Sequence, residues 1–245
     1  MSRNFELLER ASKEWDAFTF EREPLPRAER VSPPPDASTL SREELIKLVQ
    51  RIFLLDHNRR KMVVFTAVEN STGCTSICAG AAEAIAAQVE SPVCVMDGNL
   101  RRPALHLCFG MENLRGLTDA VFKPGPITQF VQKLPGNNLW LLPSGSMMSQ
   151  LSAGMKAEHL QARIKELRSE FAYVLIDSPP VSEHTDAILL GKLTDGVVLV
   201  LESNATRREV ARIAKEDLEA AQVRVLGAVL NKRTFPIPQF LYDRV

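Results

Sequence analysis

The sequence has no long apolar run and no excess of charge of one sign. Its longest uninterrupted apolar stretch covers residues 197–201, whereas a membrane-spanning helix needs about 20 such residues. The first six residues contain no apolar signal core. Lys and Arg together number 30, as do Asp and Glu, and this balance disfavours nucleic acid as a partner. We therefore expect a cytoplasmic protein with no direct membrane insertion.

Cysteine is scarce, and glycine is absent from the first 72 residues. The four cysteines are Cys74, Cys78, Cys94 and Cys108. They form no CxxC pair, which argues against a disulfide framework. A redox or soft-metal pair of Cys74 and Cys78 is the alternative to small buried apolar residues. All 12 glycines lie at or after Gly73, and five of the 15 prolines lie between Pro24 and Pro35, so a domain boundary is indicated before the middle of the chain.

Four segments follow from this change in composition. They are an amphipathic helix at 1–20, a Pro-rich linker at 21–40, a domain at 41–235 and a tail at 236–245. The first helix either packs on its own domain or docks on a partner. A second helix begins after Ser41, because Ser41 and Glu44 have the spacing of a capping box.

Apolar, strand-like runs alternate with helical patterns from Lys61 onward. Strands are predicted at 62–67, 93–96, 139–142, 174–176, 196–201 and 225–230. Helices are predicted from residue 75 and at 157–170, 184–192 and 205–221. Continuous apolar strands that alternate with helices are typical of an α/β protein with a mainly parallel sheet and helices on both faces.

The loop after the first strand has the position of a phosphate-binding loop. Such a loop follows the pattern GxxxxGK[ST] between a strand and a helix, with backbone N–H groups around the phosphates and the lysine on the outer ones. Gly73 and Thr75 match this pattern. Cys74 stands at the lysine position, Val68 at the first glycine, and Ser71 where a further glycine is usual. The loop alone is therefore a weak indication of nucleotide binding.

Longer motifs follow in a fixed order. They are DGNLRRP at 97–103, Phe109-Gly110, RGLTD at 115–119, YVLIDSPP at 173–180, Asp186-Ala187, TDGV at 194–197 and GAVLN at 227–231. This series resembles the bacterial tyrosine kinases of the CpsD/CapB/Wzc type. These proteins are relatives of MinD and ParA that regulate capsule and exopolysaccharide assembly. The resemblance covers residues 41–232 and implies a P-loop NTPase-like fold.

The resemblance also implies a site for ATP or ADP with Mg²⁺. The residues that match the family's cofactor-binding positions are Gly73, Cys74, Thr75, Ser76, Arg101 and Asn231, the last of which reads adenine in the family. Asp97 and Asp177 match catalytic positions and remain here as remnants. Thr75, Asp97 and Asp177 are the candidate Mg²⁺ ligands.

Two departures from the family affect the chemistry directly. Cys74 offers no fixed cation, and we expect the helix amino terminus to lower the pKa of its thiol, which would put a negative charge beside the phosphates. Asn99 replaces the second aspartate of the DxD pair and cannot accept a proton as a carboxylate does. Ser71 adds a Cβ where glycine permits close phosphate approach, although Asn70 tolerates a left-handed backbone. These changes predict a catalytically inactive homologue.

The function implied is that of a regulatory or scaffold protein in exopolysaccharide synthesis. Its implied partner is a membrane polysaccharide co-polymerase of the Wzz type or an active kinase paralogue, which would recruit it to the inner face of the membrane. A homo-oligomer stays open, because Glu44 and Lys47 match only part of the family's subunit-contact helix.

The alternative is an active ATP-dependent protein-tyrosine kinase with a non-standard phosphate-binding loop. In that case Arg101, Lys61 or a neighbouring subunit supplies the missing charge. Arg101 and Arg102 either bind a phosphate or a neighbouring subunit, or form a solvated turn. The family's autokinases carry a carboxyl-terminal tyrosine cluster, whereas this chain has only Tyr242 there.

Overall fold

The computed structural model describes residues 40–55, 60–146 and 157–233 of the 245-residue chain. The predicted amino-terminal helix, the Pro-rich linker and the tail with Tyr242 lie outside these residues and stay predictions. Within the described residues, no helix combines the length and apolar character that crossing a membrane requires.

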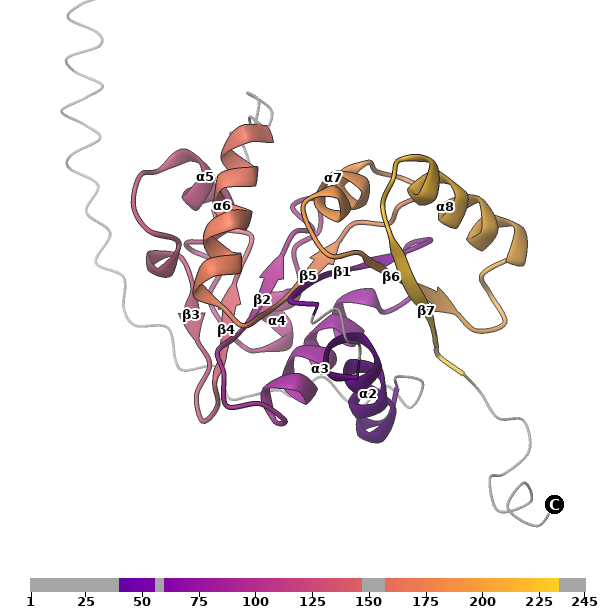
Figure 1. Cartoon of the computed structure of the whole chain (residues 1–245), viewed down its shortest axis with the longest axis horizontal. Helices are drawn as coiled ribbons and strands as arrows, with labels where there is room; N and C mark the ends of the chain where they lie inside the picture. The colour runs from indigo at the N-terminus through magenta and orange to yellow at the C-terminus, as the bar shows by residue number, and fades with distance from the viewer. Residues whose placement is uncertain (1–39, 56–59, 147–156, 234–245) are drawn as a thin grey trace, which may run out of the picture. The chain divides into compact units, whose positions relative to one another are not determined.

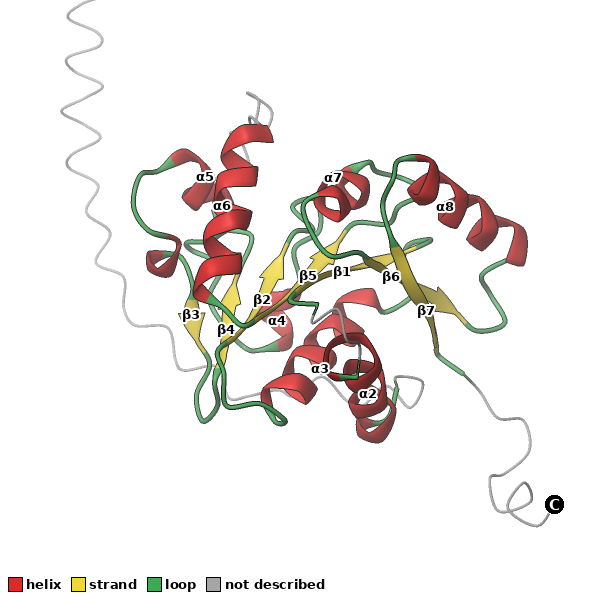
Figure 2. Cartoon of the chain, viewed as in Figure 1, coloured by secondary structure: helices red, strands yellow, loops and turns green. Residues whose placement is uncertain are grey.

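Seven strands form one sheet in the order β3-β4-β2-β5-β1-β6-β7 (Figures 1 and 2). Their bounds are Met62–Ala67 for β1, Val93–Asp97 for β2, Gln132–Lys133 for β3, Leu139–Leu142 for β4, Tyr173–Ser178 for β5, Val197–Glu202 for β6 and Val225–Asn231 for β7. Every neighbouring pair is parallel except β3 and β4. The mainly parallel sheet predicted from the sequence is therefore confirmed, with a short antiparallel edge that the sequence did not indicate.

Helices cover both faces of the sheet, as predicted (Figure 2). On one face lie α2 (Arg42–Val49), α3 (Cys74–Ala86) and α4 (Leu105–Cys108), and on the other α5 (Leu117–Phe122), α6 (Ala157–Glu170), α7 (Asp186–Lys192) and α8 (Arg208–Ala220). Strand β1 shows why: Met62 and Val64 enter one apolar core, and Val63 and Phe65 enter the other. Side chains alternate across a strand, so a fully apolar strand supplies both cores.

Helix α2 begins where the sequence places it. The Ser41 hydroxyl accepts a hydrogen bond from the Glu44 amide, and the Glu44 carboxylate accepts from the Ser41 amide at 2.8 Å. This capping box satisfies amides at the start of the helix. A π-helical turn over Gln50–Leu54 continues α2. The short helices α4 and α5 were not predicted, because one or two turns give no measurable apolar period.

The strand order brings three carboxyl ends together, since β5 lies between β1 and β2. Asp97, the last residue of β2, is in register with Asp177 of β5, and Phe65 of β1 is in register with Asp177 on its other side. Ligands of open parallel sheets bind at such carboxyl ends, where connections diverge to opposite faces. The fold thus places the loop after β1 beside two strand-end aspartates.

Gly116 offers a test of close packing beside α5. Its φ of −173° is ordinary extended backbone, but a Cβ there would lie 2.0 Å from the Pro143 carbonyl oxygen. We expect Gly116→Ala to lower the free energy of unfolding by about 3 kcal/mol, because backbone must move to admit the methyl group. Urea denaturation measures this. Gly227→Ala is the matched control, since its Cβ would meet nothing within 4 Å; equal losses in both variants would contradict the packing described.

Candidate functional site at the carboxyl ends of β1, β2 and β5

The loop between β1 and α3 lines a cavity of about 200 Å³. The lining consists of Ala67 and residues 69–75, together with Asn99, Ser178 and Pro180. Gly73 ends the loop in a left-handed conformation, with φ of 80°, and no side chain caps the helix that follows. The amides at the start of α3 are therefore left for an anion, as in other loops that lead into a helix amino terminus.

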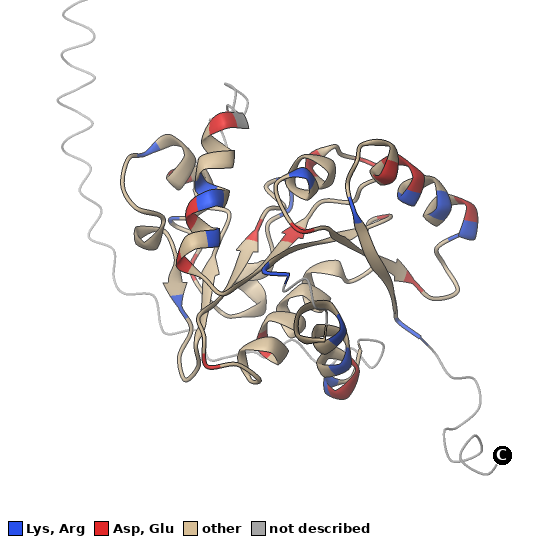
Figure 3. Ribbon diagram, in the orientation of Figure 1, with Lys and Arg blue, Asp and Glu red and all other residues tan. Residues whose placement is uncertain are grey.

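Two aspartates lie at the base of this loop (Figure 3). Asp97 accepts hydrogen bonds from the amides of Asn99, Ala104 and Leu105 at 3.0–3.2 Å. Asp177 accepts one from the Thr75 hydroxyl at 2.7 Å, and its other carboxyl oxygen is buried without a partner. Burial raises the pKa of Asp97 to about 6. Burial, reinforced by the neighbouring Asp97, raises the pKa of Asp177 to about 7.

Cys74 behaves differently from the sequence-based expectation. Its side chain is buried at the start of α3. Burial, with a further contribution from Asp177, raises the pKa of the Cys74 thiol well above its ordinary value. The prediction of a lowered pKa was wrong, because loss of hydration and a nearby carboxylate outweigh the attraction of the helix amino terminus. The residue in the lysine position is thus a neutral thiol.

Two residues at the end of β7 hold the loop from behind. The Asn231 side-chain amide donates to the Thr72 carbonyl at 2.8 Å, and the Lys232 ammonium donates to the Ser71 carbonyl at 2.7 Å. A Cβ at Gly73 would lie 2.5 Å from the Asn231 amide nitrogen, so the position needs glycine for space as well as for its positive φ. Lys232 is a residue that sequence reasoning missed, since its contact joins segments far apart in the chain.

Ser71 itself takes the left-handed conformation, with φ of 65°. We expected its Cβ to oppose the loop conformation and Asn70 to accept the left-handed backbone. The structure places the positive φ at Ser71, and the Lys232 ammonium bonds the carbonyl of that same residue. A non-glycine residue pays a conformational cost in this region, and the hydrogen bond from Lys232 helps to hold it there.

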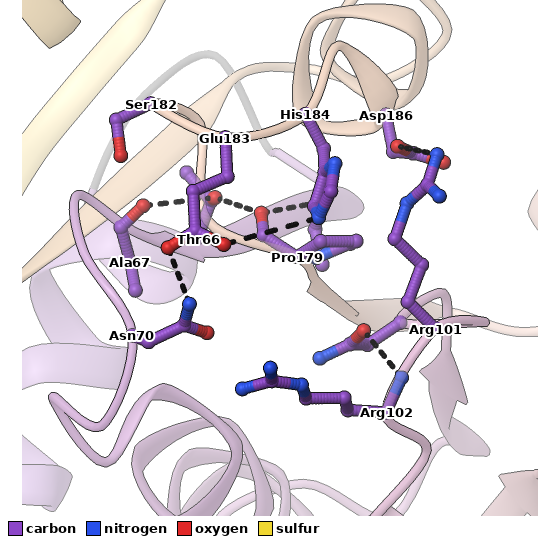
Figure 4. Close-up of polar contacts among 12 residues, drawn as sticks. Thr66, Ala67, Asn70, Arg101, Arg102, Pro179, Ser182, Glu183, His184 and Asp186 are labelled. Carbon is purple, nitrogen blue, oxygen red and sulfur yellow. Dashed lines mark hydrogen bonds and ion pairs between the residues drawn. The ribbon is translucent and has the colours of Figure 1, made fainter.

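The turn after β5 holds the opposite side of the loop (Figure 4). Asn70 donates a hydrogen bond to the Glu183 carboxylate, and the Ser182 hydroxyl donates to the Val68 carbonyl. The Val181 amide donates to the Ala67 carbonyl at 2.9 Å. The loop is consequently connected to β7 on one side and to residues 181–183 on the other.

The structure brings some of the predicted site residues together and separates others. Gly73, Cys74 and Thr75 line the cavity, whereas Ser76 is exposed on the first turn of α3 and is not part of the lining. Asn231 lies behind the loop, with its side-chain oxygen buried and unpartnered.

The two cations suggested as replacements for the loop lysine are placed differently. Arg101 forms an ion pair with Asp186 at 3.4 Å (Figure 4). Lys61 precedes β1 and so lies at the opposite end of that strand from the loop.

A parallel sheet, a loop that joins its central strand to a helix, and aspartates at two adjacent strand ends define a P-loop protein of the NTPase type. A family model described as cellulose biosynthesis protein BcsQ matches residues 60–226. The tyrosine-protein kinase YwqD of Bacillus subtilis is 32% identical over 171 residues, which cover 70% of this chain and 72% of that protein. The chain belongs to this family, the bacterial tyrosine kinases and their MinD- and ParA-related P-loop relatives.

Solved structures agree with this assignment. The chimerical protein CapA2B2 is 26% identical, with a TM-score of 0.71 over 79% of this chain and 85% of that one. The kinase domain of the Escherichia coli tyrosine kinase ETK has a TM-score of 0.72 over 91% of this chain and 89% of that one. Its identity is 21%, so that likeness concerns the fold.

The residues present fit a nucleotide with Mg²⁺ in part. Thr75 and Asp177 supply the hydroxyl and carboxylate oxygens that Mg²⁺ prefers, and the free oxygen of Asp177 has no other partner. Within the described residues, no three His, Cys, Asp or Glu side chains are placed to hold a metal ion, so phosphate oxygens and water would complete the coordination. The cavity lining contains Glu69 and neither Lys nor Arg, which disfavours a triphosphate.

The buried carboxyl pair makes stability depend on pH. In the unfolded chain an aspartate ionises near pH 3.9, but in the folded chain the pKa of Asp177 is about 7. The folded state therefore binds more protons between these values, and stability falls as the pH rises through this range. We expect Asp177→Asn to remove this penalty, so that the variant gains about 2 kcal/mol more, relative to the natural protein, at pH 8 than at pH 4.5.

Urea denaturation at the two pH values, in metal-free buffer, measures the effect. The exposed Asp217→Asn on α8 is the control. A gain from Asp177→Asn that does not change between pH 4.5 and pH 8 would contradict the raised pKa.

Proposed function

We propose that this protein is a catalytically degenerate member of the bacterial tyrosine-kinase family. It acts as a regulatory or scaffold subunit in the control of exopolysaccharide chain length, together with a membrane polysaccharide co-polymerase or an active kinase paralogue. The partner would bring it to the inner face of the cell membrane. The family assignment and the names of the relatives support the biological setting, and the site supports the loss of catalysis.

One observation carries the proposal: the position of the loop lysine holds the buried, uncharged thiol of Cys74. Phosphoryl transfer depends on positioned charge, and the lysine of a phosphate-binding loop neutralises the outer phosphates. The replacements that the alternative requires are poorly placed, because Arg101 is paired with Asp186 and Lys61 lies at the other end of β1.

The attacking hydroxyl also lacks help. Asn99 lines the cavity where relatives have the second aspartate, and its amide cannot accept a proton from a tyrosine. The Asn99 oxygen accepts a hydrogen bond from the Arg102 amide at 3.1 Å, so the side chain shapes the loop that follows β2. Removal of a single positioned charge commonly slows an enzyme by about 10²–10³, and here two groups have changed.

The full chain, mixed with ATP and Mg²⁺, tests this. We expect phosphate release and phosphotyrosine at Tyr242 to equal the background set by Asp177→Ala. The double change Cys74→Lys with Asn99→Asp restores both charged groups, and we expect it to raise phosphate release at least about tenfold. Phosphotyrosine formed by the natural protein and lost in Asp177→Ala would instead support the active kinase.

The partner has a separate test, namely cross-linking of the full chain in its native cells. We expect a membrane polysaccharide co-polymerase or a kinase paralogue to be recovered equally with the natural protein and with Asp177→Ala, because a scaffold role does not need catalysis. Recovery of neither, with the protein evenly distributed in the cell, would contradict the scaffold role.

A further inference from the structure

The cavity beside the loop combines features that attract an anion with a lack of positive charge. The amides at the start of α3 have no side-chain cap, and the buried oxygens of Thr72, Asp177 and Asn231 have no partners. Its lining, however, contains the carboxylate of Glu69 and neither Lys nor Arg. A bound phosphate group would need a cation from just outside the lining.

Arg102 stands at the edge of this cavity. Its amide donates to the side-chain oxygen of Asn99 at 3.1 Å, and Asn99 is part of the cavity wall. Figure 4 shows the Arg102 side chain extending away from Arg101, on the side where Asn70 of the loop lies. Within the part of the chain that the structure describes, the Arg102 guanidinium forms neither a hydrogen bond nor an ion pair.

The other cations nearby are already engaged. Arg101 pairs with Asp186 at 3.4 Å. Lys232 pairs with Glu202 at 3.2 Å while it holds the Ser71 carbonyl. Both would have to give up a carboxylate before binding a ligand, whereas Arg102 would give up only water.

We propose that Arg102 supplies the cation that the loop has lost, and that it binds the phosphate chain of a nucleotide held over the loop amides. A guanidinium presents a planar set of donors that matches two phosphate oxygens. It sits on the loop after β2 rather than within the phosphate-binding loop, so it enters from the side of Asn99. The inference rests on the proposed function in one respect: the pocket binds without transferring a phosphoryl group.

Calorimetric titration of the full chain with ADP and with ATP, each with and without Mg²⁺, tests the role of Arg102. We expect Arg102→Ala to weaken binding about tenfold or more, and Arg102→Lys to retain most of it. The matched control is Arg101→Ala, which removes the adjacent arginine, and we expect it to change affinity less than twofold. Added salt should weaken the natural protein more than Arg102→Ala, because an exposed ion pair is screened.

A second variant separates lost charge from altered structure. Adding Cys74→Lys to Arg102→Ala returns a cation from the other side of the cavity, and we expect it to recover the lost affinity. Equal affinity of Arg102→Ala and the natural protein, or no binding by the natural protein at millimolar nucleotide, would overturn the assignment. Phosphoryl transfer by the natural protein would instead sink the proposed function and leave the comparison of the two arginines to stand by itself.

Discussion

Asp177 lies fully buried beside Asp97, at the point where a phosphate-binding loop ordinarily brings an ammonium group close to these carboxylates. Without that group, burial and mutual repulsion favour protonated carboxyls, and the pKa values of both rise. The thiol of Cys74 stays neutral for the same reason. The interior of the site therefore avoids charge, and this is the opposite of what phosphoryl transfer needs.

The shape of the loop has survived this change. Asn231 and Lys232 bond the carbonyls of Thr72 and Ser71 from the end of β7, and the turn at 181–183 holds the other side of the loop. These contacts use carbonyl groups, so they leave amides for an anion. A pocket of this kind can keep a binding geometry after it has lost the charges for catalysis, since the two depend on different atoms. An arginine at the rim can then decide whether binding persists.

Much of the fold could be predicted from the sequence. The strands from β1 to β7 lie within one or two residues of the predicted ranges, except for β3, and the capping box at Ser41 is present. Elements of one or two turns, such as α4 and α5, carry too few residues for a periodic pattern. The motif order also placed Gly73, Thr75, Asp97 and Asp177 near one another, because the carboxyl ends of parallel strands share one edge.

The sequence by itself determined the α/β class, the family and the absence of a lysine from the loop, because these depend on residue identity and on local period. Only the tertiary structure decided what each charge does. It buried Cys74 next to Asp177, and so reversed the pKa shift expected from the helix amino terminus. It paired Arg101 with Asp186 and left Arg102 without a partner among the described residues. Hydration and charge pairing depend on neighbours distant in the chain, so no local pattern records them.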